Sequence, residues 1–265
     1  MRRNQLFWGI ILLLAGGLLL AGEMGIRLPN GNSLLSLFWP VVLIFAGILV
    51  LFSIFLRGSN ETENVSIDLQ GAQQASLKLN HGAGEFKVHS GAGMNEMVHA
   101  TVTGGVEQKV NRNGDRLEVK LRPAHDFLSI PFIGPSNQLN WDVAINPNVP
   151  TSLRMNLGAN KSEIDLHDMN ITDLKLETGA SDTMLTLPAR GRFLADLDLG
   201  AASLTLIIPD GLSARIRASL GAADMKVDSS RFPRNGGYYQ SPDYETAANA
   251  ADVTIDAGAA SIRIK

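Results

Sequence analysis

Histidines and acidic side chains are the groups in this chain whose types and spacing could support chemistry. No two of the five histidines stand four residues apart, as a zinc site on one helix would require. His81 and His89 flank one short segment, so a metal site there is an alternative to ordinary strand histidines. Acidic residues two positions apart, such as Asp196 and Asp198, could form an acid–base pair or bind calcium. The same alternation is typical of the solvated face of a strand.

Other catalytic and cofactor-binding patterns are missing from the sequence. Gly82-Ala83-Gly84 resembles a fragment of a phosphate-binding loop, but no Lys-Ser or Lys-Thr follows it. Cysteine is absent, which excludes disulfides, a thiolate nucleophile and cysteine metal sites. An enzyme acting on envelope carbohydrate or lipid would need a cleft with converging acidic groups, which alternating outward carboxylates do not predict. We therefore expect no enzyme activity, no catalytic residue, no cofactor and no metal.

A 21-residue repeat must position these side chains. Gly-Ala pairs recur at that spacing, at residues 158–159, 179–180, 200–201 and 221–222. Apolar and polar residues alternate on either side of each pair, which is the period of a strand with one buried face. Outlying copies surround Gly82 and Gly258, so six rungs can be counted. The repeat predicts a β-solenoid of about 21-residue rungs that stack coil upon coil.

Each Gly-Ala pair is expected to form a corner between the two strands of a rung. The glycine would either adopt a positive φ or allow a close approach of the neighbouring backbone. The alanine is expected to keep the interior narrow, so a larger residue at Ala201 should overpack the stack.

Two inserted loops interrupt the repeat, and the first follows a predicted hairpin. Asn113-Gly114 favours a hairpin of residues 106–110 and 116–121. The loop at residues 122–138 then carries apolar side chains among three prolines, and a strand at 140–146 with Trp141 returns the chain to the solenoid. Membrane contact, docking on a partner and self-packing are alternatives for this loop. Its candidate partner-binding residues are Phe127, Phe132 and Ile133.

The second inserted loop, around residues 230–244, holds all three tyrosines of the chain among prolines and glycines. Exposed tyrosine, arginine and phenylalanine side chains are the usual anchors of a protein interface. The same rings could instead cover the last open rung, because a solenoid needs capping at its ends. The candidate partner-binding residues of this loop are Phe232, Arg234, Tyr238, Tyr239 and Tyr244.

The first 57 residues differ from the rest, because they contain two long uncharged apolar stretches. Residues 1–57 predict a transmembrane helical hairpin, with helices at about 5–26 and 34–56, ahead of a solenoid domain at 58–265. A cleaved signal peptide is the alternative for the first stretch. Arg2, Arg3 and Arg57 outnumber the single basic residue of the connection, which predicts a solenoid on the cytoplasmic side. The formal net charge of -3 does not favour nucleic acid as a partner.

Several short motifs resemble one bacterial family. Trp8-Gly9 and Phe38-Trp39-Pro40, which open the two apolar stretches, are similar to the transmembrane region of LiaI and LiaF proteins. The soluble part resembles the toast-rack or LiaF-like C-terminal β-solenoid. The stretches that carry this second resemblance are 79–85, 177–180, 230–237, 241–244 and 256–262.

The resemblance implies a role in bacterial cell-envelope stress signalling, in which LiaF-type proteins restrain a membrane histidine kinase of a two-component system. We therefore expect a membrane-anchored all-β protein, multi-pass in the bacterial cell membrane, that is non-catalytic and regulates a membrane partner. The partners implied are the lipid bilayer and a histidine kinase or related envelope protein. A structural or adhesin-like envelope scaffold without a signalling role is the alternative. The oligomeric state is not predicted.

Overall fold

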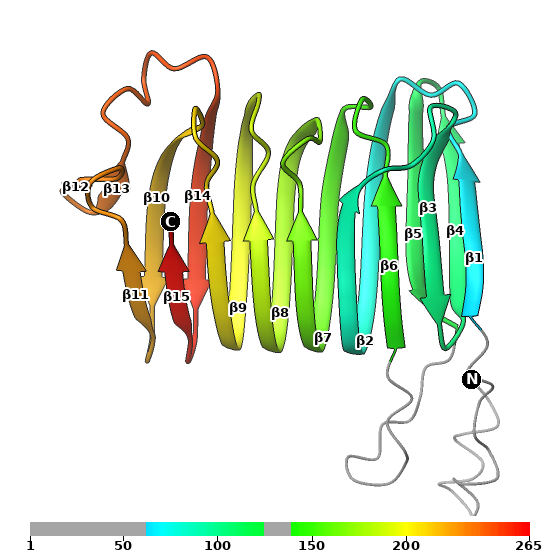
Figure 1. The fold of residues 1–265 in the computed structure, drawn as a ribbon, viewed down its shortest axis with the longest axis horizontal. Coiled ribbons are helices and arrows are strands. Elements are labelled where there is room, and N and C mark those ends of the chain that lie inside the picture. The colour runs from blue at the N-terminus through cyan, green and yellow to red at the C-terminus, as the bar shows by residue number, and fades with distance from the viewer. Residues whose placement is uncertain (1–61, 125–138) are drawn as a thin grey trace, which may run out of the picture. The chain divides into compact units, whose positions relative to one another are not determined.

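A computed structural model describes residues 62–124 and 139–265, and these form one 15-stranded sheet (Figure 1). The predicted transmembrane hairpin and the loop with Phe127, Phe132 and Ile133 lie outside the described residues. Within the described ranges, no helix is long and apolar enough to cross a membrane. In chain order the strands are β1 (Thr62–Asp68), β2 (Gln74–Ser90), β3 (Glu96–Thr103), β4 (Val106–Asn113), β5 (Arg116–Pro123), β6 (Leu139–Ile145), β7 (Thr151–Asp165), β8 (Ile171–Thr186), β9 (Arg192–Ile207), β10 (Ser213–Leu220), β11 (Asp224–Val227), β12 (Arg234–Asn235), β13 (Tyr238–Gln240), β14 (Ala250–Ala257) and β15 (Ser261–Ile264).

The four long strands β2, β7, β8 and β9 bend sharply at their Gly-Ala pairs (Figure 1). Buried and exposed residues alternate along each half of these strands, as the sequence predicts for a strand with one apolar face. At each pair the alternation breaks, because the glycine and the alanine are both exposed. The chain therefore turns there, and the second half of the strand faces the first across a shared interior.

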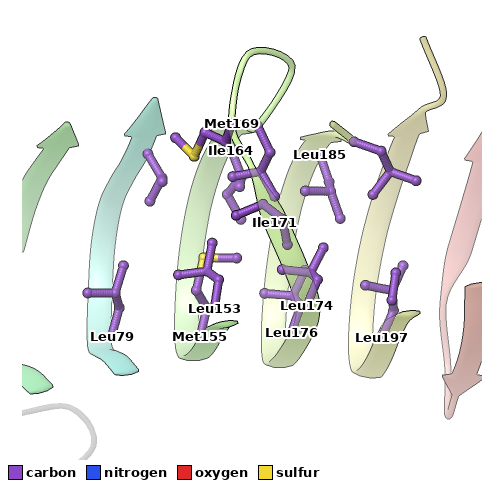
Figure 2. Close-up of a cluster of buried hydrophobic side chains, with 14 of the residues drawn as sticks. Leu79, Leu153, Met155, Ile164, Met169, Ile171, Leu174, Leu176, Leu185 and Leu197 are labelled. Carbon is purple, nitrogen blue, oxygen red and sulfur yellow. The ribbon is translucent and has the colours of Figure 1, made fainter. Parts of the chain in front are cut away.

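Residues 21 positions apart in the sequence lie side by side on the neighbouring strands β7, β8 and β9. Parallel pairing places Leu153 beside Leu174, and Met155 beside Leu176, which in turn lies beside Leu197. Like positions therefore stack, and their apolar side chains form a continuous core in which most members are less than 5% exposed (Figure 2). Burial of these stacked leucines is the main contribution to stability, because each fully buried aliphatic side chain contributes about 2 kcal/mol.

The spatial order of the rungs differs from their order in the sequence. The last copy of the repeat, in β14 and β15, lies between β9 and β10. Ile255 of β14 pairs with Leu197 on one side and with Ala218 on the other. The segment between β11 and β14 is long enough to return the chain past β10 to β9, so the C-terminal rung can take this place. The bend glycines therefore follow the order Gly82, Gly158, Gly179, Gly200, Gly258 and Gly221.

The bend glycines allow close packing of adjacent backbones, and none of them has a positive φ. A Cβ atom on Gly179 would lie 2.9 Å from the carbonyl oxygen of Gly158, and one on Gly200 would lie 2.8 Å from that of Gly179. The expectation for the alanines is wrong, because Ala201 is exposed and does not face the interior. Small interior residues occur one position later, as at Ala202.

The other end of the stack, before β2, is closed by strands of a different pattern. The predicted hairpin is confirmed as β4 and β5, with Asn113 opposite Arg116. The predicted returning strand is confirmed as β6, whose Trp141 lies beside Phe86. Strand β3 then pairs antiparallel with β6, and β1 pairs antiparallel with β3.

Candidate interaction site

An open groove of about 890 Å³ follows the bends across five rungs. Three successive positions of every rung line it: an outward polar residue, an inward residue and the bend glycine. On the first of these rungs the three are Asn156, Leu157 and Gly158. The groove exists because the glycines carry no side chain, so the floor is backbone and the outward polar residues form one wall.

Three carboxylates lie next to one another along this wall. Register places Glu177 beside Asp198, and Asp198 beside Asp256. Neighbouring strands in a sheet are about 4.8 Å apart, so the three negative charges repel one another unless cations compensate them. Lys175 supplies one such cation, with its Nζ atom 3.1 Å from Glu177 and 3.5 Å from Asp198. The hydrogen bond to Glu177 raises the pKa of Lys175, and Asp198 adds to this effect.

The floor of the groove contains a buried polar group without a protein partner. Thr178 lines the groove, is 7% exposed, and its Oγ1 atom has no hydrogen bond. A buried hydroxyl without a partner is uncommon, because its desolvation is not compensated. The Thr178 hydroxyl lies beneath the floor, so the wall carboxylates are the charged groups that the groove exposes. In the described part of the chain, no three residues are grouped as metal ligands.

The tyrosine segment, residues 228–249, packs against β10 instead of protruding freely. Phe232 is fully buried in the apolar core and Tyr244 is 7% exposed. These two rings are unavailable as surface anchors, and the capping alternative describes them. Tyr238 and Tyr239 are half-buried, whereas Arg234 is exposed. A partner at this segment would therefore meet Arg234 and the edges of two tyrosines.

Arg215 of β10 holds the tyrosine segment in place. Its guanidinium lies 4.3 Å from the ring centroid of Tyr244 and 5.4 Å from that of Tyr238. It also donates a 2.7 Å hydrogen bond to Gln240 and forms an ion pair with Glu245. An arginine between two aromatic rings stabilises them through cation–π contacts. The sequence alone does not single out Arg215, because the alternation marks it only as an outward strand residue.

Hydrogen bonds hold the tyrosine segment where it returns to β14. The Ser213 hydroxyl donates to Asp243 over 2.7 Å, and the amide of Ala214 donates to the Ser241 hydroxyl over 2.9 Å. Arg192 of β9 donates to the carbonyl oxygens of Tyr244 and Ala247. The segment is therefore tied to two different rungs.

The four histidines within the described residues do not converge. His89 is exposed and lies 2.8 Å from Asp142, and a hydrogen bond with the Ser90 carbonyl raises its pKa. His81 points into the interior between the rings of Phe86 and Trp141, with both centroids 5.2 Å away. His125 lies outside the described residues, and the remaining two histidines are exposed beside acidic neighbours.

His81 is held as a neutral ring. Its Nε2 atom donates to the carbonyl oxygen of Leu139 over 3.0 Å, and its Nδ1 atom accepts from the side-chain amide of Asn160. Burial lowers the pKa of His81 to about 4, although the Leu139 hydrogen bond opposes this change. We conclude that His81 is a structural residue of the first rung.

The described residues form a mostly β domain of stacked parallel rungs with an acidic groove along its bends. The chain belongs to the toast-rack family: the model for the N-terminal domain of toast_rack, DUF2154, matches residues 56–207. The model for the LiaF transmembrane domain matches residues 7–66, which makes this a membrane protein. The comparison with curated proteins found no match.

A solved structure shares the fold of this chain. A Clostridium sporogenes protein that is named for cell adhesion superposes with a TM-score of 0.65 at 20% identity, over 77% of this chain and 98% of its own. A Bacteroides fragilis protein named as an adhesin covers 78% of this chain and 98% of its own, but its TM-score is 0.31 and its identity 8%. The first similarity shows the fold alone.

Proposed function

We propose that this protein is a non-catalytic, membrane-anchored regulator, and that its toast-rack domain binds the soluble part of a membrane signalling partner such as a two-component histidine kinase. The observation that carries the proposal is the pairing in one chain of a LiaF transmembrane domain with a toast-rack domain. The transmembrane segment would place the domain beside a membrane partner, and the groove offers a surface for it.

The groove supports this proposal through its charge and its length. Carboxylates on three successive rungs suit a basic, extended segment, because such a segment can place cations at the spacing of the rungs. The groove lies on the stacked backbone of five rungs, so binding there requires little reorganisation.

Deletion of the gene, combined with a transcriptional reporter of the kinase, tests the proposal. We expect reporter output to rise without the protein and to return to its restrained level when the wild-type chain is supplied. A chain with Glu177→Gln, Asp198→Asn and Asp256→Asn should restore restraint poorly. A matched control with Glu163→Gln, Asp165→Asn and Asp182→Asn removes three exposed carboxylates outside the groove and should restore it fully. Reporter output that does not respond to deletion, with or without wall-active antibiotics, would refute the regulatory role.

We further propose that residues 1–57 cross the membrane twice and that the toast-rack domain lies in the cytoplasm. The support is the excess of basic residues at both ends of the hairpin. Because the chain has no cysteine, Ser230→Cys provides a single reporter thiol at an exposed position. Labelling with a membrane-impermeant maleimide only after lysis is the expected result, whereas labelling in intact cells would place the domain outside.

An adhesin-like envelope scaffold is the second candidate, and the name of the Clostridium sporogenes structure favours it. This function requires an external domain that binds a surface. Intact-cell labelling of Ser230→Cys, together with an unresponsive kinase reporter, would support the scaffold over the regulator.

A further inference from the structure

The stack ends at β11, and Phe232 and Tyr239 cover only part of the apolar interior there. Met225 and Val227 of β11 are half-buried. The residues at the same positions of the adjacent rung, Ile262 and Ile264 of β15, are at most 2% exposed. Leu220, just before the final bend, is 36% exposed. The apolar residues of β11 are therefore less well covered than those at the same positions of the adjacent rung.

The outer edge of β11 also has free backbone hydrogen-bonding groups. The amides of Asp224 and Asp228 donate to carbonyl oxygens of the β15 rung. Because successive residues of a strand point their amide and carbonyl groups to opposite sides, those of Ala223, Met225 and Val227 point to the outer side. Among the described residues, β15 is the strand that pairs with β11, and none pairs with its outer side (Figure 1).

The segment that follows β11 does not cover this edge. Arg231 donates to the carbonyl oxygens of Ile208 and Pro209, over 2.7 Å and 3.1 Å, which draws the chain back over the stack. Strand β13 then pairs with Arg215 and Ile216, the part of β10 farther from the bend. The opposite end of the stack is different, because the outer strand β4 is largely polar and exposed, as protected sheet edges commonly are.

We propose that the β11 edge, residues Ala223–Val227, pairs antiparallel with the β11 edge of a second copy of this chain. The five residues are self-complementary when the two-fold axis passes through Met225. Asp224 then lies opposite Lys226 of the other copy, and this outward charge pair occurs twice. On the inner face, Ala223 lies opposite Val227 and the two Met225 residues meet, so apolar residues cover the open interior of both copies.

The same register satisfies the free backbone groups. The two Met225 residues exchange amide-to-carbonyl hydrogen bonds, and Ala223 does so with Val227 of the other copy. Alignments centred on Asp224 or Lys226 also pair exposed amides, but they place Asp224 opposite Asp224 or Lys226 opposite Lys226 of the other copy. Charge therefore selects the register centred on Met225. The contact is small, so we expect weak association, which becomes effective because the LiaF-type transmembrane domain confines both copies to one membrane.

Charge reversal tests the pairing in the full-length chain. Two differently tagged copies are co-expressed, and their co-purification is measured in native-membrane nanodiscs. Asp224→Lys or Lys226→Asp alone places like charges opposite each other twice and should weaken association about tenfold. The double variant Asp224→Lys/Lys226→Asp restores opposite charges and should restore association. Asp182→Lys makes the same change at the equivalent position of an interior rung and should have no effect.

Cysteine cross-linking tests the register separately. A chain with Asp224→Cys and a chain with Lys226→Cys should form a disulfide when mixed in one membrane, because the two positions face each other about 4.5 Å apart at Cα. Neither variant should cross-link to itself. The proposal would be overturned if the wild-type chain did not co-purify with itself, or if the single charge reversals associated like the wild type. It would also be overturned if the charge swap did not restore association, or if either cysteine variant cross-linked equally well to itself. These results are independent of the kinase reporter.

Discussion

The carbonyl oxygen of Gly82 lies 2.3 Å from the position that a Cβ atom on Gly158 would occupy. These two residues belong to neighbouring rungs that are separated in the sequence by four other strands. The missing side chain therefore allows the backbones of β2 and β7 to approach at the bend, and the same contact recurs along the stack.

Gly158→Ala is expected to destabilise the domain by about 2 kcal/mol or more, because the new methyl group overlaps backbone that cannot easily move. Gly82→Ala is the matched control in the same row. A Cβ atom on Gly82 would meet only the side chain of Leu139 at 3.6 Å, so this change should cost little. Chemical denaturation of the full-length protein in detergent measures both. Equal losses at the two positions would contradict the role of close backbone approach.

The cost in unfolding free energy of truncating a leucine should depend on which side of its strand the side chain lies. Leu176→Ala removes a fully buried side chain and should lower the free energy of unfolding by about 2–5 kcal/mol. Leu194, on β9, is 64% exposed, so Leu194→Ala should change it by less than about 0.5 kcal/mol. Denaturation midpoints of the two variants provide the comparison, and a large cost at Leu194 would indicate a contact outside the described residues.

Substitutions at Phe232 and Arg234 should distinguish an effect on folding stability from an effect on partner binding. Phe232→Ala opens a cavity in the core and should cost about 3–5 kcal/mol. Arg234 is exposed, so Arg234→Ala should leave the unfolding free energy within about 0.5 kcal/mol of the wild type. If the tyrosine segment also binds a partner, Arg234→Ala will weaken kinase restraint in the reporter strain while the protein remains folded. Full restraint by this variant would limit the segment to capping.

Acidification should destabilise the domain through His81. Its folded-state pKa of about 4 lies below the ordinary value of 6.5, so the unfolded chain binds the proton more readily. The stability that comes from the neutral ring is complete above about pH 6.5 and decreases as the pH falls toward 4, by at most about 3 kcal/mol. His81→Gln removes this titration, so the wild type should lose more stability than the variant between pH 7 and pH 4.5. Parallel pH profiles would contradict the assignment.

The repeat could be predicted from the sequence because its physical requirements are local. A buried face needs an apolar residue at every second position, and a bend under a neighbouring rung needs a glycine, so both recur at 21 residues. Asn113-Gly114 likewise predicts its hairpin, since few other dipeptides suit a two-residue turn. The family also follows from motifs that lie within single rungs and within the apolar N-terminal stretches.

Tertiary structure alone decided which rungs are neighbours. Copies of a repeat have nearly the same edges, so the sequence does not show that the copy at Gly258 lies beside Gly200, with the copy at Gly221 beyond it. It also does not show that Glu177, Asp198 and Asp256 form one wall, or that Arg215 lies between two tyrosine rings. These contacts join residues that are distant along the chain. The alternation of buried and exposed positions specifies the face of the sheet on which a side chain lies, but it does not specify which residues that side chain contacts there.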